Sequence, residues 1–77
     1  MRVKFIVFHS DIVALFPDEI YNVDLYNHKL IMSYAHIGQH SGASRDLMHC
    51  KKARPNQYAD LLDGLKQIGY TDLQIMN

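Results

Sequence analysis

One amphipathic helix near the C-terminal end of the chain constrains the fold more than any other feature. Apolar side chains recur three and four residues apart, which places them on a single stripe of a helix over residues 55–68. Pro55 suits the first helical position, and Gly69 suits the left-handed residue that ends a helix. The stripe consists of Tyr58, Leu61, Leu62, Leu65 and Ile68. A helix with one apolar face needs a partner surface, so we expect it to pack on a sheet.

Alternating side chains predict the first part of that sheet. Residues 2–8 carry one wholly apolar face, made of Val3, Phe5 and Val7. Turn-forming residues follow, and the apolar pattern then resumes, so residues 2–16 are predicted to form an antiparallel hairpin. Pro17 cannot donate a hydrogen bond to a neighbouring strand, and we expect it to end the second strand.

The remaining strands are predicted at residues 30–36 and 71–76. Residues 20–29 match neither the helical nor the strand period and are interpreted as an ordered loop. A strand that follows a helix commonly returns to the sheet by a right-handed crossover, so residues 71–76 should lie parallel to the first strand. The predicted fold class is α+β, with a small mixed or antiparallel sheet and one helix on one face, in a single domain over residues 1–77.

Residues 45–53 fit two alternatives. Ser44 could cap a short helix with Asp46 in its first turn, in agreement with the helix dipole. Residues 47–53 could instead form a strand beside residues 30–36, which would make the polar segment before them the tip of a hairpin.

Charge and hydropathy exclude several classes of partner. Eight basic and eight acidic residues cancel, so we expect no non-specific binding of nucleic acid, with a local patch at Lys51, Lys52 and Arg54 as the exception. No apolar run approaches the roughly 20 residues that span a bilayer, and the first residues lack the cleavage pattern of a signal peptide. A soluble cytoplasmic protein with no membrane partner is therefore expected.

The size of the chain predicts self-association. A chain of 77 residues buries only about 60% of the surface that its unfolded form exposes, so its margin of stability is thin. Cys50 is the only cysteine, which excludes an internal disulfide. Apolar residues on both faces of the hairpin would gain from a second copy of the chain that covers one of them.

The polar segment 36–45 is the main candidate for a binding site, because histidines, glycines and serines are concentrated in it. Its glycines allow backbone amides to approach a ligand, and its side chains add hydrogen-bond donors that would suit a small anionic ligand. We expect a structural role for His36, Gly38 and Gly42. We expect an exposed ligand-binding or partner-binding surface at Gln39, His40, Ser41 and Arg45.

Five tyrosines are more than so small a core obviously needs, and tyrosine is favoured on half-buried surfaces. Tyr58 and Tyr70 are predicted to be core residues. Tyr21 and Tyr26 are predicted to contact a protein partner.

Two alternative functions involve the same histidines. His36 and His40 could bind zinc, although residues four apart on a strand lie about 13 Å from each other, so the loop would have to bend. A hydrolase-like enzyme could pair Ser41 or Ser44 with a histidine, or Cys50 with His49, but sequence neighbours rarely meet in that geometry. We therefore favour a small non-enzymatic binding module with no cofactor.

Four stretches carry a resemblance. They are Ala-Leu-Phe-Pro at 14–17, Ser-Tyr-Ala-His-Ile-Gly-Gln-His-Ser at 33–41, Pro-Asn-Gln-Tyr-Ala-Asp-Leu at 55–61 and Ile-Gly-Tyr at 68–70. Together they resemble a family of short proteins encoded in bacterial genomes and mobile elements. The resemblance implies one domain and no particular activity. The family tends to have a threonine before the proline and acids after it; the residues here are Arg54, Asn56 and Gln57, which predicts a weaker cap at the helix start.

Overall fold

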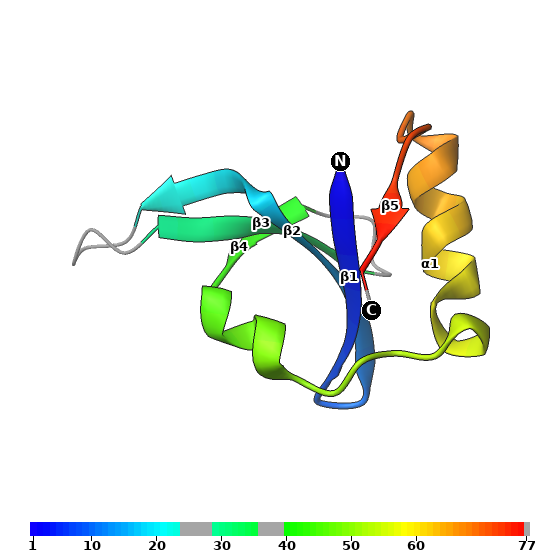
Figure 1. The fold of residues 1–77 in the computed structure, drawn as a ribbon, viewed down its shortest axis with the longest axis horizontal. Helices are drawn as coiled ribbons and strands as arrows, with labels where there is room; N and C mark the ends of the chain where they lie inside the picture. Colours follow the sequence, from blue (N-terminus) through cyan, green and yellow to red (C-terminus); the bar gives the residue numbers. More distant parts are fainter. Residues whose placement is uncertain (24–28, 36–39, 77) are drawn as a thin grey trace.

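The computed structural model describes residues 1–23, 29–35 and 40–76. Within these residues the chain forms one five-stranded sheet, one α-helix and one 3-10 helix, which confirms the α+β class (Figure 1). The sheet order is β4-β3-β2-β1-β5. The elements are β1 (Arg2–Phe8), β2 (Asp11–Val23), β3 (Lys29–Ala35), β4 (His40–Ala43), η1 (Arg45–His49), α1 (Pro55–Gln67) and β5 (Gln74–Ile75).

The predicted hairpin is confirmed, and its turn is short. β1 and β2 pair antiparallel up to Phe8 and Asp11, which leaves only His9 and Ser10 in the turn. Both have positive φ, 49° and 69°, as a two-residue turn that follows the right-handed twist of the strands requires.

Pro17 does not end the second strand, contrary to the sequence prediction. β2 continues to Val23, so the expected loop is wrong for residues 20–23, while residues 24–28 lie outside the described part. The pairing of β2 with β3 shifts between Phe16 and Ile20, and Pro17 lies inside this irregularity. A proline at a bulge removes no regular ladder hydrogen bond, and this allows the strand to pass through it.

The outer edge of β1 is covered along its length by two separate segments. β5 pairs parallel with Arg2 and Val3, as predicted for the final strand, although β5 has only two residues. Further along, Lys52 forms an antiparallel bridge with Ile6. The amide of Val7 donates to the carbonyl of Lys51 at 2.8 Å, which strengthens this second contact.

The two alternatives for residues 45–53 can now be distinguished. Residues 45–49 form η1, and the hydroxyl oxygen of Ser44 accepts a hydrogen bond from the Asp46 amide at 3.2 Å, so the short capped helix is confirmed over residues 45–49. It does not extend over residues 50–53. A strand at residues 47–53 beside β3 is wrong. The polar segment itself supplies that strand, because β4 pairs antiparallel with β3.

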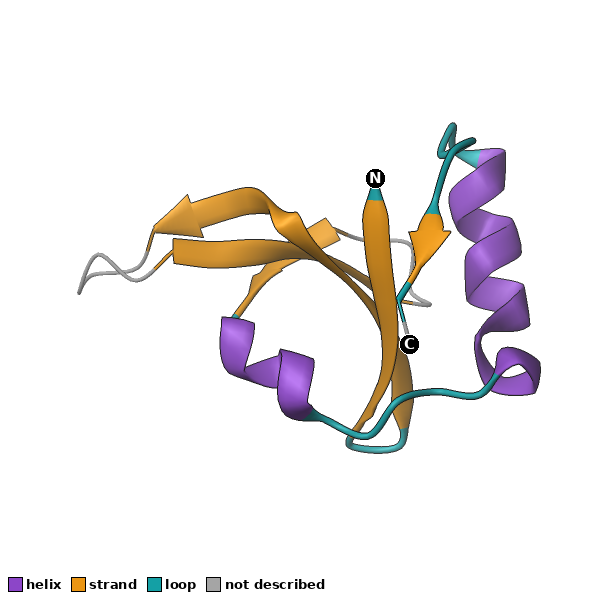
Figure 2. Cartoon of the chain, in the orientation of Figure 1, coloured by secondary structure: helices purple, strands orange, loops and turns teal. Residues whose placement is uncertain are grey.

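Figure 2 shows α1 and η1 on opposite sides of the sheet, and each face has its own apolar cluster. On one face, Leu61 and Leu65 of α1 are buried, and the ring of Phe5 stacks on Tyr58 with centroids 4.3 Å apart. On the other face, η1 covers a cluster of Ile6, Leu15, Ile31 and Ala43. Alternate side chains of each strand therefore enter different clusters, as the strand period predicts.

Both ends of α1 depart from the expected pattern in small ways. Ile68 does not continue the buried stripe: it is 53% exposed, because the helix ends at Gln67 and Gly69 turns the chain away with φ of 117°. At the start, Arg54 has no side-chain acceptor, so only half of a capping box forms. That half is the hydrogen bond from the Arg54 amide to Oε1 of Gln57, at 2.8 Å.

Candidate functional site

An open groove of about 420 Å³ lies on the face of the sheet that η1 covers. Its apolar lining comes from Phe8, Val13, Ala35, Ala43 and Leu47. Its polar lining comes from the serines Ser33, Ser41 and Ser44, together with Gly42. The groove therefore combines a mainly apolar surface with a few hydroxyl groups, and no charged residue lines it among those that the structure describes.

Strand register places the two central serines of the groove opposite each other. Ser33 of β3 pairs with Ser41 of β4, so both side chains point to the same face. Ser33 is buried, at 4% exposure, whereas Ser41 is exposed. The hydroxyl of Ser33 donates to the carbonyl oxygen of Ser41 at 3.0 Å, and the two hydroxyl oxygens are 2.9 Å apart.

The predicted surface around His40 and Ser41 is divided between the two faces of the sheet. Adjacent residues of a strand point to opposite sides, and His40 accordingly lies on the side of α1. Its Nε2 atom is 2.9 Å from the hydroxyl oxygen of Tyr70, and its ring packs edge-on against Tyr34 with centroids 4.8 Å apart. His40 is thus engaged within the chain and takes no part in the groove.

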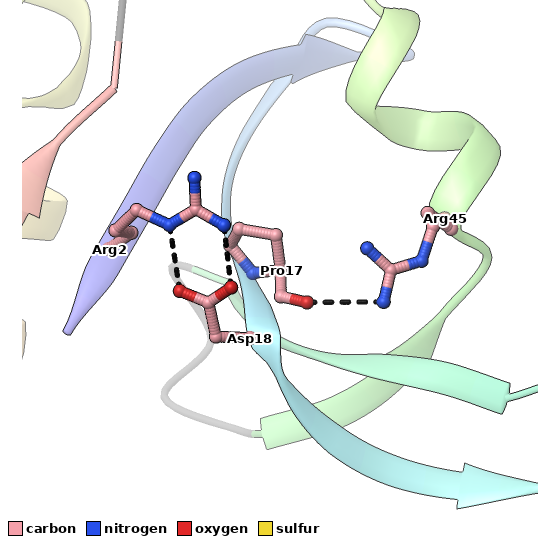
Figure 3. Close-up of polar contacts among 4 residues, drawn as sticks. All are labelled: Arg2, Pro17, Asp18 and Arg45. Carbon is pink, nitrogen blue, oxygen red and sulfur yellow. Dashed lines mark hydrogen bonds and ion pairs between the residues drawn. The ribbon is translucent and has the colours of Figure 1, made fainter.

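Arg45 supports the irregular part of β2 (Figure 3). Its guanidinium donates to the carbonyl oxygen of Pro17 at 3.2 Å. Next to it, Arg2 donates two hydrogen bonds to the carboxylate of Asp18, at 2.8 and 2.6 Å. These hydrogen bonds hold the pKa of the Asp18 carboxyl below its ordinary value. Arg45 therefore does not line the groove, although the sequence placed it beside Ser41.

Gly42 has the tight surroundings that a structural glycine requires. A Cβ atom at this position would lie 3.0 Å from Cδ1 of Leu30 and 3.0 Å from Cδ1 of Tyr21. The ring of Tyr21 thus reaches over β4, while half of its surface stays exposed. Of the other predicted site residues, Tyr26, His36, Gly38 and Gln39 lie outside the described residues. Tyr58 and Tyr70, predicted to be core residues, are partly buried and pack against the cluster beneath α1.

Neither a catalytic base nor a cluster of metal ligands is found at the groove in the part of the chain that the structure describes. His40 points to the face opposite Ser41, and no histidine lines the groove in the described ranges. Among the described residues, no three or more histidine, cysteine or acidic side chains lie close enough together to hold a metal ion.

Sequence reasoning found Ser41 but missed Ser33 and the apolar walls. Phe8, Val13 and Leu47 come from three separate elements; strand register brings Phe8 and Val13 to the same face, and the packing of η1 on that face adds Leu47. A usable signal existed, because residues 33 and 41 are the two serines that a tight antiparallel pairing of residues 31–34 with 40–43 would place opposite each other.

No protein-family model matches the chain, and no curated protein or solved structure shows a significant similarity to it. The resemblance noted from the sequence motifs stays a prediction. None of the helices in the described ranges has the length and apolar character needed to cross a bilayer.

Proposed function

We propose that this protein is a small non-enzymatic binding module and that the groove beside η1 is its ligand site. The observation that supports the proposal is the groove itself, with its volume of about 420 Å³, its apolar walls and its pair of hydrogen-bonded serines. Ligand sites in proteins are typically concave, of about 300 to 1,000 Å³, and mainly apolar with a few convergent polar groups. The proposed setting of this activity is the cytoplasm.

The walls of the groove are held in place from both sides, which favours a preformed site. Ser33 is fixed by its two contacts with Ser41, and the η1 wall is anchored where the ammonium of Lys4 donates to the carbonyl oxygen of Met48 at 2.6 Å. A site that is already shaped loses less conformational entropy when its ligand binds.

Filling the groove tests the proposal. Ala35 lines the groove, and the variant Ala35→Phe places a ring into it, whereas Ala59→Phe places the same ring on the exposed face of α1. We titrate both variants and the wild type with indole and follow the backbone amides by ¹H–¹⁵N NMR. The wild type and Ala59→Phe should show saturable shifts at Ser33, Ser41 and Leu47.

Ala35→Phe should lose those shifts while keeping the dispersed spectrum of a folded protein. Shifts spread over the whole surface in the wild type, or equal shifts in both variants, would contradict a ligand site in the groove.

A second candidate function is assembly with another copy of the chain, supported by the projecting end of β2. Figure 1 shows β2 and β3 extending away from the rest of the sheet. Two neighbouring residues there, Ile20 and Tyr21, are 51% and 49% exposed. Apolar side chains of this size gain from burial in an interface.

Sedimentation velocity over the micromolar range tests this assembly. The wild type should sediment faster with increasing concentration, and Ile20→Lys should remain at the 8.9 kDa of one chain. The control Ile75→Lys changes an exposed isoleucine of β5 and should behave as the wild type. A wild-type monomer at every concentration would exclude the interface.

A further inference from the structure

The number of donor hydrogens and acceptor lone pairs on the hydroxyls of Ser33 and Ser41 determines which kind of ligand group the groove can recognise. Each hydroxyl has one hydrogen to donate and two lone pairs that accept. The Oγ atom of Ser33 is 3.0 Å from the carbonyl oxygen of Ser41, and this oxygen can only accept. The single hydrogen of Ser33 is therefore directed to the main chain of β4.

The contact between the two hydroxyls then has only one consistent direction. Their oxygens are 2.9 Å apart, so one of them donates. With the hydrogen of Ser33 directed to the carbonyl oxygen, the arrangement that satisfies both contacts has Ser41 donating its own hydrogen to Ser33. The alternative would turn two lone pairs toward each other across the 3.0 Å contact between Ser33 and the carbonyl oxygen of Ser41.

Ser41 is left with lone pairs and no hydrogen for a ligand. Its side chain is exposed and lines the groove, so these lone pairs are available to a bound molecule. On this basis, which rests on the proposed function of the groove, we propose that the site recognises a neutral, mainly apolar molecule that donates one N–H or O–H hydrogen bond to Oγ of Ser41.

The charge of the lining supports a neutral ligand. Among the described residues, no acidic side chain lines the groove to pair with an ammonium group, and no basic side chain lines it to pair with a carboxylate or a phosphate. An ion transferred from water into such a site would lose hydration without compensation. The small anionic ligand that the polar segment suggested is therefore disfavoured here.

Within the described part of the chain, Ser44 is the third serine that lines the groove. Its hydroxyl oxygen accepts a hydrogen bond from the Asp46 amide at 3.2 Å. This contact does not use the hydroxyl hydrogen of Ser44, which could be donated to an acceptor atom of a ligand. An experiment must therefore compare donor and acceptor ligands of one shape.

Three bicyclic probes make that comparison: indole donates one N–H bond, benzothiophene has the same shape without a donor, and quinoline only accepts. Dissociation constants come from the amide shifts of the groove residues in ¹H–¹⁵N NMR. The wild type should bind indole about two- to tenfold more tightly than benzothiophene, the range expected for one neutral hydrogen bond. Quinoline should gain nothing over benzothiophene.

The variant Ser41→Ala removes the acceptor and leaves Ser33 bonded to the same main-chain carbonyl. It should bind benzothiophene as the wild type does and lose the preference for indole, whereas Thr71→Ala, which removes an exposed hydroxyl elsewhere, should keep that preference.

Equal binding of indole and benzothiophene by the wild type, tighter binding of quinoline, or an indole preference that survives in Ser41→Ala would each overturn this inference while the groove remained a ligand site. If no probe shifts the groove amides, the proposed function fails as well.

Discussion

The hydroxyl oxygen of Tyr70 lies 2.9 Å from Nε2 of His40, and this contact joins the edge strand β4 to the turn that follows helix α1. The Tyr70 ring also stacks on Phe16 of β2, with centroids 5.3 Å apart. Residues from the middle and the end of the chain thus meet above the same face of the sheet. The contact holds His40, the first residue of β4, against the turn that follows α1.

Tyr70→Phe isolates the hydrogen bond because it keeps the ring. We expect the variant to lower the free energy of unfolding by about 0.5 to 1 kcal/mol, the lower part of the usual range, since the bond is exposed. Urea denaturation of Tyr70→Phe, His40→Ala and the double variant gives the coupling between the two side chains. Strictly additive effects would show that the contact does not form in solution.

The same variant has a distinct effect at alkaline pH. Partial burial, together with nearby Glu19, raises the pKa of the Tyr70 hydroxyl above its ordinary value. The folded protein therefore holds this proton more tightly than the unfolded chain does. Stability should fall as the pH rises above about 10, and the fall should be shallower in Tyr70→Phe. Parallel curves of unfolding free energy against pH would contradict this.

Asp18 should make the protein less stable as the pH falls, whereas Tyr70 makes it less stable as the pH rises. Two hydrogen bonds from Arg2 hold the pKa of the Asp18 carboxyl below its ordinary value, so the folded state favours the charged form. This stabilisation is present at neutral pH and is lost as the pH falls through the folded pKa. In urea denaturation at decreasing pH, Asp18→Asn should lose stability less steeply than the wild type.

The variant Arg2→Met, which removes the other side chain of the pair, should also make the free energy of unfolding fall less steeply at acid pH, because the Asp18 carboxylate loses the hydrogen bonds that stabilise it. Both side chains are half exposed, so added salt should reduce the difference. An unchanged acid slope in both variants would exclude a role for the pair.

Local patterns in the sequence predicted the elements whose neighbours are close in the chain. The hairpin, the helix from Pro55 and the parallel return of the last strand all follow from side-chain period and turn chemistry. The prediction that Pro17 ends the second strand was wrong because a proline destabilises a strand only where the neighbouring strand needs its missing N–H group as a hydrogen-bond donor. Here β3 skips the residues around it, and Arg45 satisfies its carbonyl from 28 residues away.

The site was harder to predict than the fold, because strand pairing determines which side chains share a face. The polar segment was identified as one surface, yet His40–Ala43 form a strand, so His40 and Ser41 point to opposite faces. The signal for Ser33 lay only in the antiparallel pairing that places it opposite Ser41, and that pairing was not predicted. Only the pairing with β4 turns it from a buried serine into part of a groove.

The glycines provide a matched pair of variants. A Cβ at Gly42 would meet Leu30 and Tyr21 at 3.0 Å, whereas a Cβ at Gly64 in α1 meets nothing within 4 Å. Gly64→Ala should raise the free energy of unfolding by about 0.5 to 1 kcal/mol through helix propensity alone. Gly42→Ala should lower it by about 1 kcal/mol, since both side chains must shift. Thermal and urea denaturation of the two variants measure this, and stabilisation by Gly42→Ala would contradict the close packing.

The two serines of the groove should differ in their effect on stability, although they contact each other. Ser33→Ala removes the hydroxyl that donates to the carbonyl of Ser41 from a buried position, and should lower the free energy of unfolding by about 1 kcal/mol. Ser41→Ala removes an exposed hydroxyl and leaves that bond in place, so its cost should be smaller. Urea denaturation compares the two. A larger loss for Ser41→Ala would mean that the hydrogen of Ser33 points to the Ser41 hydroxyl, and the direction of the whole pair would be reversed.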